Sequence, residues 1–148
     1  MSAGESDLRR GIAVLDQYRE QIEALAQQQE IIRISLEEHM RARETITRYR
    51  EAGRGAEVLV PIGANSFLVG ESKDVDKAFV SIGSDLLVYD DTEKQIERLD
   101  ARIKSITDAA NAIGQRLGEM QRRGEAHGAA VQDLYDRIQA KGAPDERT

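Results

Sequence analysis

The chain has 148 residues, of which 32% are charged and only 4% are aromatic, and its formal net charge is -6. So few large side chains argue against a compact globule of this length, whereas high charge with regularly spaced apolar residues favours long helices washed by solvent. The acidic balance, without a basic stripe, argues against a nucleic-acid binder, and the absence of cysteine excludes disulfides, thiolate metal sites and cysteine nucleophiles.

Residues 6–52 are predicted to form the first long helix. This stretch has no proline and one glycine, and apolar residues recur in heptads interrupted by polar ones. Ser2 with Glu5 has the spacing of a capping box, Ser6 is an alternative cap, and Gly53 is expected to end the helix. The two seams of this a/d pattern run through Leu8, Leu15, Ile22, Gln29, Leu36 and Arg43, and through Gly11, Tyr18, Leu25, Ile32, His39 and Ile46.

The segment 56–90 changes character and is predicted to form two β-hairpins. Its β-branched and aromatic runs lie on either side of two short turns, Gly63-Ala64-Asn65 and Gly83-Ser84-Asp85. The four predicted strands cover residues 57–62, 66–71, 77–82 and 86–90. Pro61 cannot donate a ladder hydrogen bond, so we expect a sheet edge or a bulge at that position.

Two isolated hairpins cannot bury a core of their own, because such pairs of strands are marginally stable in water and leave open edges. The sequence therefore predicts oligomerisation through this β segment. The residues expected to carry the assembly are Val58, Val60, Ile62, Phe67, Val69, Phe79, Val80, Ile82, Leu87 and Tyr89.

Residues 92–141 are predicted to form the second long helix. Thr92 and Gln95 have capping-box spacing, and the helix is expected to end at Gly142. We expect residues 142–148 to be a disordered tail. The heptad seams continue without a break through Ile96, Ile103, Ala110, Leu117, Gly124, Val131 and Ile138, and through Leu99, Ile106, Ile113, Met120, His127 and Leu134.

The two predicted helices match in length, which favours their folding back on each other. In such an antiparallel pair the residue numbers of opposed positions sum to about 143, so that Leu8 lies near Tyr135. Two separate parallel coiled coils with partner chains are the alternative, but they would not require equal lengths. The prediction is an α+β fold in which a long antiparallel two-helix coiled coil carries two β-hairpins between its helices.

The β segment, together with the long heptad helices on either side of it, resembles the alpha subunit of archaeal prefoldin. The motif that carries the resemblance is Val60-Pro61-x-Gly63-x-x-Ser66-Phe67, then Gly70, Lys77-x-x-Val80 and Gly83. Two hairpins rather than one are typical of the alpha type. Asp85 departs from the family, which often has a second glycine there, but aspartate tolerates left-handed backbone geometry and the turn should persist.

The resemblance implies an assembly of two alpha and four prefoldin beta subunits, in which the hairpins form an oligomeric β-barrel platform. It also implies a chaperone that captures non-native polypeptides without ATP and delivers them to a group II chaperonin. A structural coiled-coil scaffold or adaptor that binds one folded partner is the alternative function.

The sequence contains no set of residues with the types and spacing of a known catalytic site. His39 and His127 both fall on heptad seams and are read as polar interruptions of the coiled coil. We expect no catalytic residue, metal site or cofactor, and no nucleic-acid or membrane partner. The N-terminal ten residues have no apolar stretch typical of a signal peptide, and the longest apolar runs are far shorter than the ~20 residues that span a bilayer. We therefore expect a cytoplasmic protein.

Two further features of the helices have a functional interpretation. The residues near the free ends, which are expected to bind substrate at the tip of the arm, are Leu8, Ile12, Leu15, Tyr135 and Ile138. Gly114, Gly118, Gly124 and Gly128 weaken the second helix by up to about 1 kcal/mol each relative to alanine, which indicates either sequence drift or an arm that flexes to suit its cargo.

Overall fold

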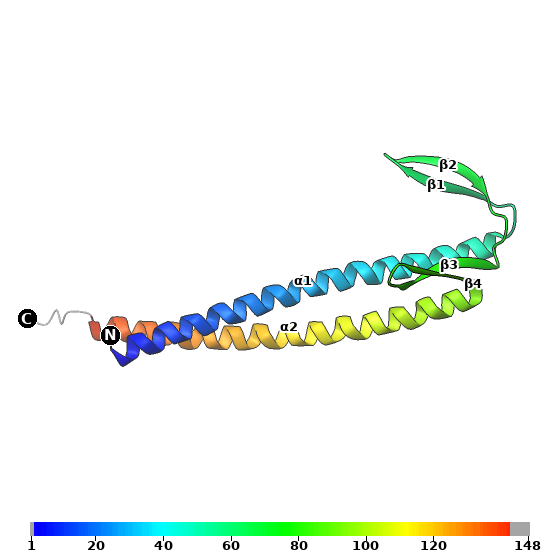
Figure 1. The fold of residues 1–148 in the computed structure, drawn as a ribbon. Helices are drawn as coiled ribbons and strands as arrows, with labels where there is room; N and C mark the ends of the chain where they lie inside the picture. The colour runs from blue at the N-terminus through cyan, green and yellow to red at the C-terminus, as the bar shows by residue number, and fades with distance from the viewer. Residues whose placement is uncertain (1, 143–148) are drawn as a thin grey trace, which may run out of the picture. The chain divides into compact units, whose positions relative to one another are not determined.

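The chain forms a long helix, four short strands and a second long helix in the computed structural model, which describes residues 2–142 (Figure 1). Helix α1 is Ala3–Ala52 and helix α2 is Thr92–Gly142. Between them lie two separate two-stranded antiparallel sheets, β1 with β2 and β3 with β4. The strands are β1 (Glu57–Gly63), β2 (Ser66–Glu71), β3 (Lys77–Gly83) and β4 (Leu86–Asp91). The predicted combination of long helices and two hairpins is confirmed.

The ends of the helices follow local capping chemistry. The N–H of Glu5 donates to Ser2 Oγ at 3.3 Å, so Ser2 caps α1, which begins three residues before the predicted start. The backbone leaves α1 through Gly53, whose φ of +77° a glycine adopts without strain. Helix α2 includes Gly142, which was predicted to be the first residue of the tail, and the rest of that predicted tail, 143–148, lies outside the described residues.

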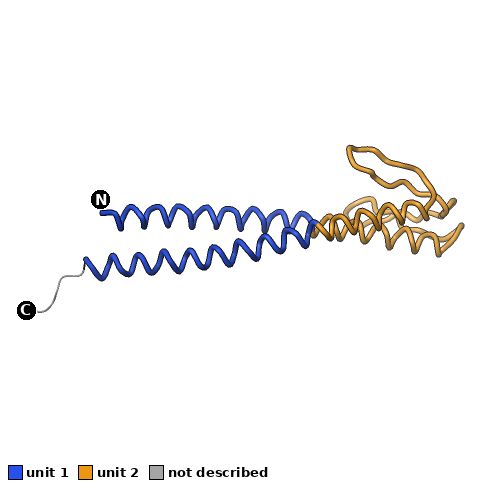
Figure 2. The backbone as a smooth tube through the Cα atoms, turned by 90° about the horizontal axis from the view of Figure 1, so that it is seen from below, with its two compact units in different colours: residues 1–32, 109–148 blue, residues 33–108 orange. Residues whose placement is uncertain are grey.

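The chain divides into two compact units, residues 1–32 with 109–148 and residues 33–108 (Figure 2). In the first unit the two helices run antiparallel in the predicted register. A methyl group added at Gly128 would lie 3.7 Å from Leu15 Cδ1, and one added at Gly114 would lie 3.8 Å from Gln29 Nε2. Both pairs of residue numbers sum to 143, the value expected from helix length alone.

The second unit keeps the same register. Arg43 of α1 and Asp100 of α2, whose numbers also sum to 143, form an ion pair and a second hydrogen bond of 3.3 Å from Nη2 to Oδ2. The apolar interior of this unit is small: within residues 33–108 the buried apolar side chains are Val75, Val80 and Leu99.

Both hairpins have tight two-residue turns. Ala64 and Asn65 in the first turn, and Ser84 and Asp85 in the second, all have positive φ between 48° and 60°, as type I′ turns require. Asp85 therefore adopts the left-handed geometry expected of it. The pairing slips once in each hairpin, and in the first the irregularity lies between Pro61 and Gly63, next to the proline for which a sheet edge or a bulge was expected.

The first hairpin is closed at its base by Ser72. Its backbone exchanges hydrogen bonds of 2.8 Å with Gly55 N–H and the Ala56 carbonyl. The Ser72 hydroxyl accepts from Ala56 N–H at 2.9 Å and donates to the Gly53 carbonyl at 2.8 Å. This buried serine joins the start and the end of the hairpin at one point.

Candidate interaction surfaces

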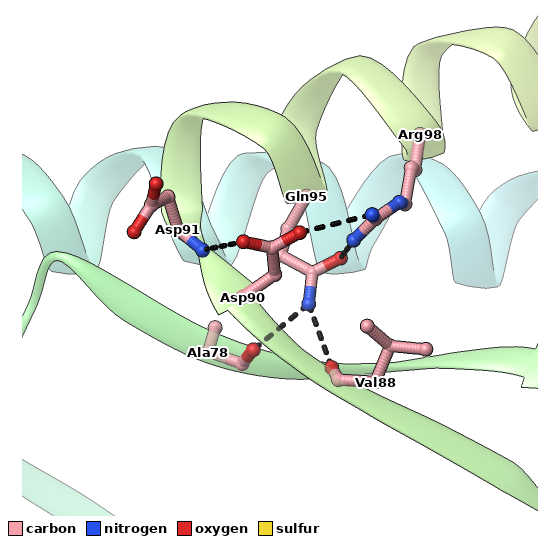
Figure 3. A network of polar contacts seen from close by, with 6 residues as sticks. All are labelled: Ala78, Val88, Asp90, Asp91, Gln95 and Arg98. Atoms are coloured by element: carbon pink, nitrogen blue, oxygen red, sulfur yellow. Dashed lines mark hydrogen bonds and ion pairs between the residues drawn. The ribbon is translucent and has the colours of Figure 1, made fainter.

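The second hairpin packs one face on α2 through a buried amide. Gln95 is fully buried, and its Nε2 donates to the carbonyls of Ala78 and Val88 at 2.9 and 2.7 Å (Figure 3). Its Oε1 accepts from Arg98 Nη1 at 3.0 Å. One side chain thus fixes both strands of this hairpin to the first turn of the helix.

The role of Gln95 differs from the one expected from the sequence. A capping box would need its side chain at the N–H of Thr92, but that N–H donates to the Asp76 carbonyl at 2.7 Å. The correct spacing for a cap therefore coincides with a tertiary contact. No local sequence signal distinguishes the two, because the acceptors come from strands that lie before the helix in the chain.

Charged side chains extend the same contact along α2. Arg98 Nη2 lies 2.9 Å from Asp90 Oδ2 (Figure 3), and Arg102 Nη1 donates to the Ser81 carbonyl at 2.7 Å. Asp90 also accepts from the N–H of Asp91 at 2.8 Å. This hydrogen bond, helped by Arg98 and Lys94, holds the pKa of Asp90 below its usual value against the opposing effect of burial.

The opposite face of the second hairpin is apolar and open. Phe79 and Tyr89 are directly paired across the strands, and their ring centroids are 4.5 Å apart. They are 65% and 51% exposed, and the neighbouring Leu87 is 64% exposed. Val80, next to Phe79 in the strand, lies on the other face and is buried within this chain, although the sequence analysis assigned it to assembly.

The first hairpin is exposed on both faces. Leu59 pairs with Val69 on one face, and Val60 pairs with Leu68 on the other, and all four are at least 46% exposed. Val58, on the face of Val60, is half-buried. Strands that are apolar on both sides are typical of sheets covered on both sides.

The hairpin surface consists of the large apolar side chains that the two hairpins leave exposed. Three of these, Leu59, Leu68 and Leu86, are missing from the sequence-based list. The strand sequences alone do not show which residues share a face, whereas the cross-strand register assigns each residue to one. The full set is Leu59, Val60, Ile62, Phe67, Leu68, Val69, Phe79, Ile82, Leu86, Leu87 and Tyr89.

The helix-end cluster in the first unit consists of Leu8, Ile12, Leu15, Tyr135 and Ile138. Ile12 and Tyr135, which lie off the heptad seam, are 45% and 46% exposed, and the other three are half-buried. Ile138 Cγ1 lies 3.6 Å from the position of a Cβ on Gly4, so the last turns of α2 cover the first turn of α1.

A polar contact pins the helices next to this cluster. His127 Nε2 lies 2.8 Å from the carbonyl of Gly11, and because a carbonyl only accepts, the ring nitrogen donates. The ring also lies beside Tyr18, with centroids 5.8 Å apart. His127 thus links the two helices, whereas His39 contacts the Ser35 carbonyl of its own helix at 2.6 Å.

Other kinds of site are not seen in the part of the chain that the structure describes. Within residues 2–142, no group of three or more histidine or acidic side chains is arranged to hold a metal ion. Neither helix there has a stretch apolar and long enough to traverse a bilayer.

Comparison with known proteins agrees with the resemblance seen in the sequence. The family model described as "Prefoldin subunit" matches residues 18–140. The chain is 28% identical to the prefoldin subunit alpha of Methanosarcina mazei over 89% of this chain and 97% of that protein. It is 34% identical to the prefoldin subunit alpha of Pyrococcus horikoshii over 70% of each chain.

Solved structures share the fold at lower sequence identity. The crystal structure of the prefoldin beta subunit from Thermococcus strain KS-1 superposes with a TM-score of 0.59 at 16% identity, covering 86% of this chain and 90% of that one. The cryo-EM structure of filamentous PFD from Methanocaldococcus jannaschii gives a TM-score of 0.51 at 22% identity, covering 87% and 98%.

Proposed function

The chain belongs to the prefoldin family as a chaperone subunit of the alpha type, and from this premise we propose that it captures non-native polypeptides without ATP. In this proposal it holds them in an assembly of two alpha and four beta subunits and delivers them to a group II chaperonin. It acts in the cytoplasm and catalyses no reaction.

The exposure of the hairpin surface is the observation that supports assembly. Its side chains are apolar, lie on both faces of the first hairpin and are about half exposed or more. Contiguous apolar patches of this kind mark protein interfaces in soluble proteins. Burial in a β-barrel platform, with the hairpins of beta subunits as neighbours, would remove this surface from water and pair the open strand edges.

The helix-end cluster is the proposed grip for non-native proteins. Unfolded chains expose apolar segments without a fixed shape, which open aliphatic and aromatic side chains such as Ile12 and Tyr135 can contact. Each buried large side chain contributes at most roughly 1.5–3 kcal/mol before the cost of ordering. Several arms that hold one chain add their weak contacts by avidity, so no nucleotide-driven step is needed for capture.

The test is protection of an aggregating client by the assembled chaperone. Replacing Ile12 and Tyr135 together by serine should leave the assembly intact and reduce protection markedly. Ile31→Ser is the matched control, because Ile31 is 67% exposed in the same unit but lies away from the helix ends. Since apolar contacts are not screened as ion pairs are, high salt should not abolish the protection.

Two outcomes would count against this proposal. Unchanged protection in the doubly substituted assembly would place the grip elsewhere, most directly on the underside of the hairpin platform. Failure of the unmodified assembly to suppress aggregation at all would favour the scaffold or adaptor that binds one folded partner.

A further inference from the structure

The two hairpins are structural repeats separated by twenty residues. Strands β1 and β3, and strands β2 and β4, begin twenty positions apart. The registers coincide as well, since Leu59 pairs with Val69 where Phe79 pairs with Tyr89. The irregularity before each turn falls at the same place, and Gly63 and Gly83 both have a φ of +98°. Each backbone group of one hairpin therefore has an equivalent in the other.

The face of the second hairpin that packs on α2 shows how a helix binds such a hairpin. The carbonyls of Ala78 and Val88 flank the Phe79–Tyr89 pair diagonally, and both accept from the Gln95 amide. Four residues later in the helix, Leu99 is 3% exposed on the side where Val80 is buried. Seven residues after Gln95, Arg102 reaches a third hairpin carbonyl.

The first hairpin has an equivalent helix-binding face, and there this face is exposed. The equivalents of the two carbonyls that bind Gln95 belong to Val58 and Leu68, and Pro61 supplies the equivalent of the third. Within residues 2–142, no side chain donates to any of these three carbonyls. Val60, the equivalent of buried Val80, is 46% exposed, and Leu68 is 58% exposed.

We propose that this face of the first hairpin docks on the opening turns of a helix from a different subunit of the assembly. The helix carries an amide side chain that donates to the Val58 and Leu68 carbonyls. It carries a large apolar residue four positions later, and an arginine or lysine seven positions later that reaches the Pro61 carbonyl. This inference rests on the proposed hetero-oligomeric chaperone and specifies the partner's contact.

A second copy of this chain does not fit the role. Its Gln95 is fully buried under its own second hairpin, so the helix surface of the required pattern is already occupied. The two faces also differ in charge, because Gly70 stands where Asp90 pairs with Arg98. The space above Gly70 is filled by Val58, whose Cγ2 is 3.4 Å from the position of a Cβ there. The partner helix therefore needs no cation three residues after its amide.

Carbonyl chemical shifts of the assembled protein test the contact directly. The probe is the beta-type subunit of the same genome, co-expressed with this chain. Labelling valine carbonyls with carbon-13 and leucine nitrogens with nitrogen-15 makes only Val–Leu peptide bonds doubly labelled. These are Val58–Leu59 and, as a distant reference, Val14–Leu15. Carbon-13 in leucine carbonyls with nitrogen-15 in valine selects Leu68–Val69, with Leu59 and Leu87 as neighbouring references.

The size of the expected shift is calibrated within this chain. Comparison of wild type with Gln95→Met gives the change at the Ala78 and Val88 carbonyls when an amide is removed. On assembly, the carbonyls of Val58 and Leu68 should shift in the direction of hydrogen bonding by a comparable amount, while the reference carbonyls shift less. If the subunits assemble but both carbonyls stay unshifted, the inference is wrong. It is also wrong if copies of this chain assemble without the beta-type subunit and give the same shifts.

A hairpin exchange provides a second test within the full chain. Residues 77–91 are replaced by a second copy of residues 57–71, which has the same length. If the two faces are equivalent receptors, the new hairpin docks on Gln95 and the carbonyls matching Val58 and Leu68 show the calibrated shift. A variant that folds without that shift would refute the equivalence. Neither measurement uses a client protein, so failure of client protection alone would leave this inference standing.

Discussion

Among single residues, the glycines of the first unit show why the same residue type has different roles. Gly124 is buried between the helices, where a methyl group would lie 3.5 Å from Ile22 Cδ1 and 3.6 Å from Tyr18 Cβ. These are ordinary contacts. A methyl group at Gly11 would instead lie 2.9 Å from Val131 Cγ2, which real Cβ atoms essentially never approach so closely. A methyl group is therefore accommodated at Gly124, whereas at Gly11 the Val131 side chain would have to move.

Alanine substitutions separate the two cases. Gly124→Ala should raise the free energy of unfolding by about 1 kcal/mol, because alanine favours the helix and its methyl group is accommodated. Gly11→Ala has the same helical gain but must displace the stiff Val131 side chain, so it should stabilise less or destabilise. Urea unfolding at one fixed protein concentration measures both. Equal stabilisation by the two substitutions would contradict the close contact at Gly11.

The depressed pKa of Asp90 predicts a specific loss of stability in acid. The N–H of Asp91, then Arg98 and Lys94, favour the charged carboxylate in the folded state. A folded pKa below the unfolded value of about 3.9 gives stability that is present above that pH and is lost as the pH falls through the folded pKa. Asp90→Asn should therefore make the fall in stability below about pH 4 shallower than in wild type. An unchanged slope would show that Asp90 contributes nothing to acid unfolding.

At the level of the elements, the heptad pattern and the turn residues predict most of what is observed. The helix register follows from matching helix lengths, and the hairpins follow from β-branched runs on either side of glycine-containing turns. The docking of the second hairpin could not be predicted, because Gln95 has capping-box spacing and its true acceptors are backbone carbonyls of Ala78 and Val88. Every residue has a backbone carbonyl, so the residue types of the strands do not indicate which carbonyls accept a side-chain hydrogen bond.

Hydrogen exchange along α2 should differ between the two units. In the second unit, Thr92, Gln95 and Leu99 are buried and the seam continues through Ile96–Ile106 without a glycine. In the first unit, Gly124 and Gly128 lower the intrinsic helix propensity. Amides at 96–106 should therefore be better protected than those at 124–131. Equal protection along α2 would refute this difference in stiffness.

For the whole molecule, the candidate sites were predictable in type rather than in detail. Exposure of Ile12 and Tyr135 follows from their positions off the heptad seam. The sequence does not assign the faces of the hairpins, because that needs the cross-strand register, and Val80 was therefore counted among the assembly residues although it is buried within this chain. The pattern of apolar residues predicts that a strand face is buried, but it does not show whether the same chain or another subunit buries it.

Assembly should depend on the β segment as a unit. A variant in which residues 56–90 are replaced by a short flexible linker should remain helical by circular dichroism, because the heptad seams are intact. In sedimentation with its beta-type partner it should no longer form the full-size hexamer, because the hairpin surface is gone. A variant that still sediments at full size would show that the helices carry assembly.

The closed base of the first hairpin has an evolutionary consequence. Because Ser72 is hydrogen-bonded to Gly55 and Ala56, the chain enters and leaves this hairpin at one point. An element that returns the chain to where it began can be inserted or deleted without shifting the helices that follow. Gain or loss of one twenty-residue block would thus change the number of hairpins while the α1–α2 register stayed the same. Subunits with one hairpin and with two can in this way descend from one ancestor through a single internal duplication.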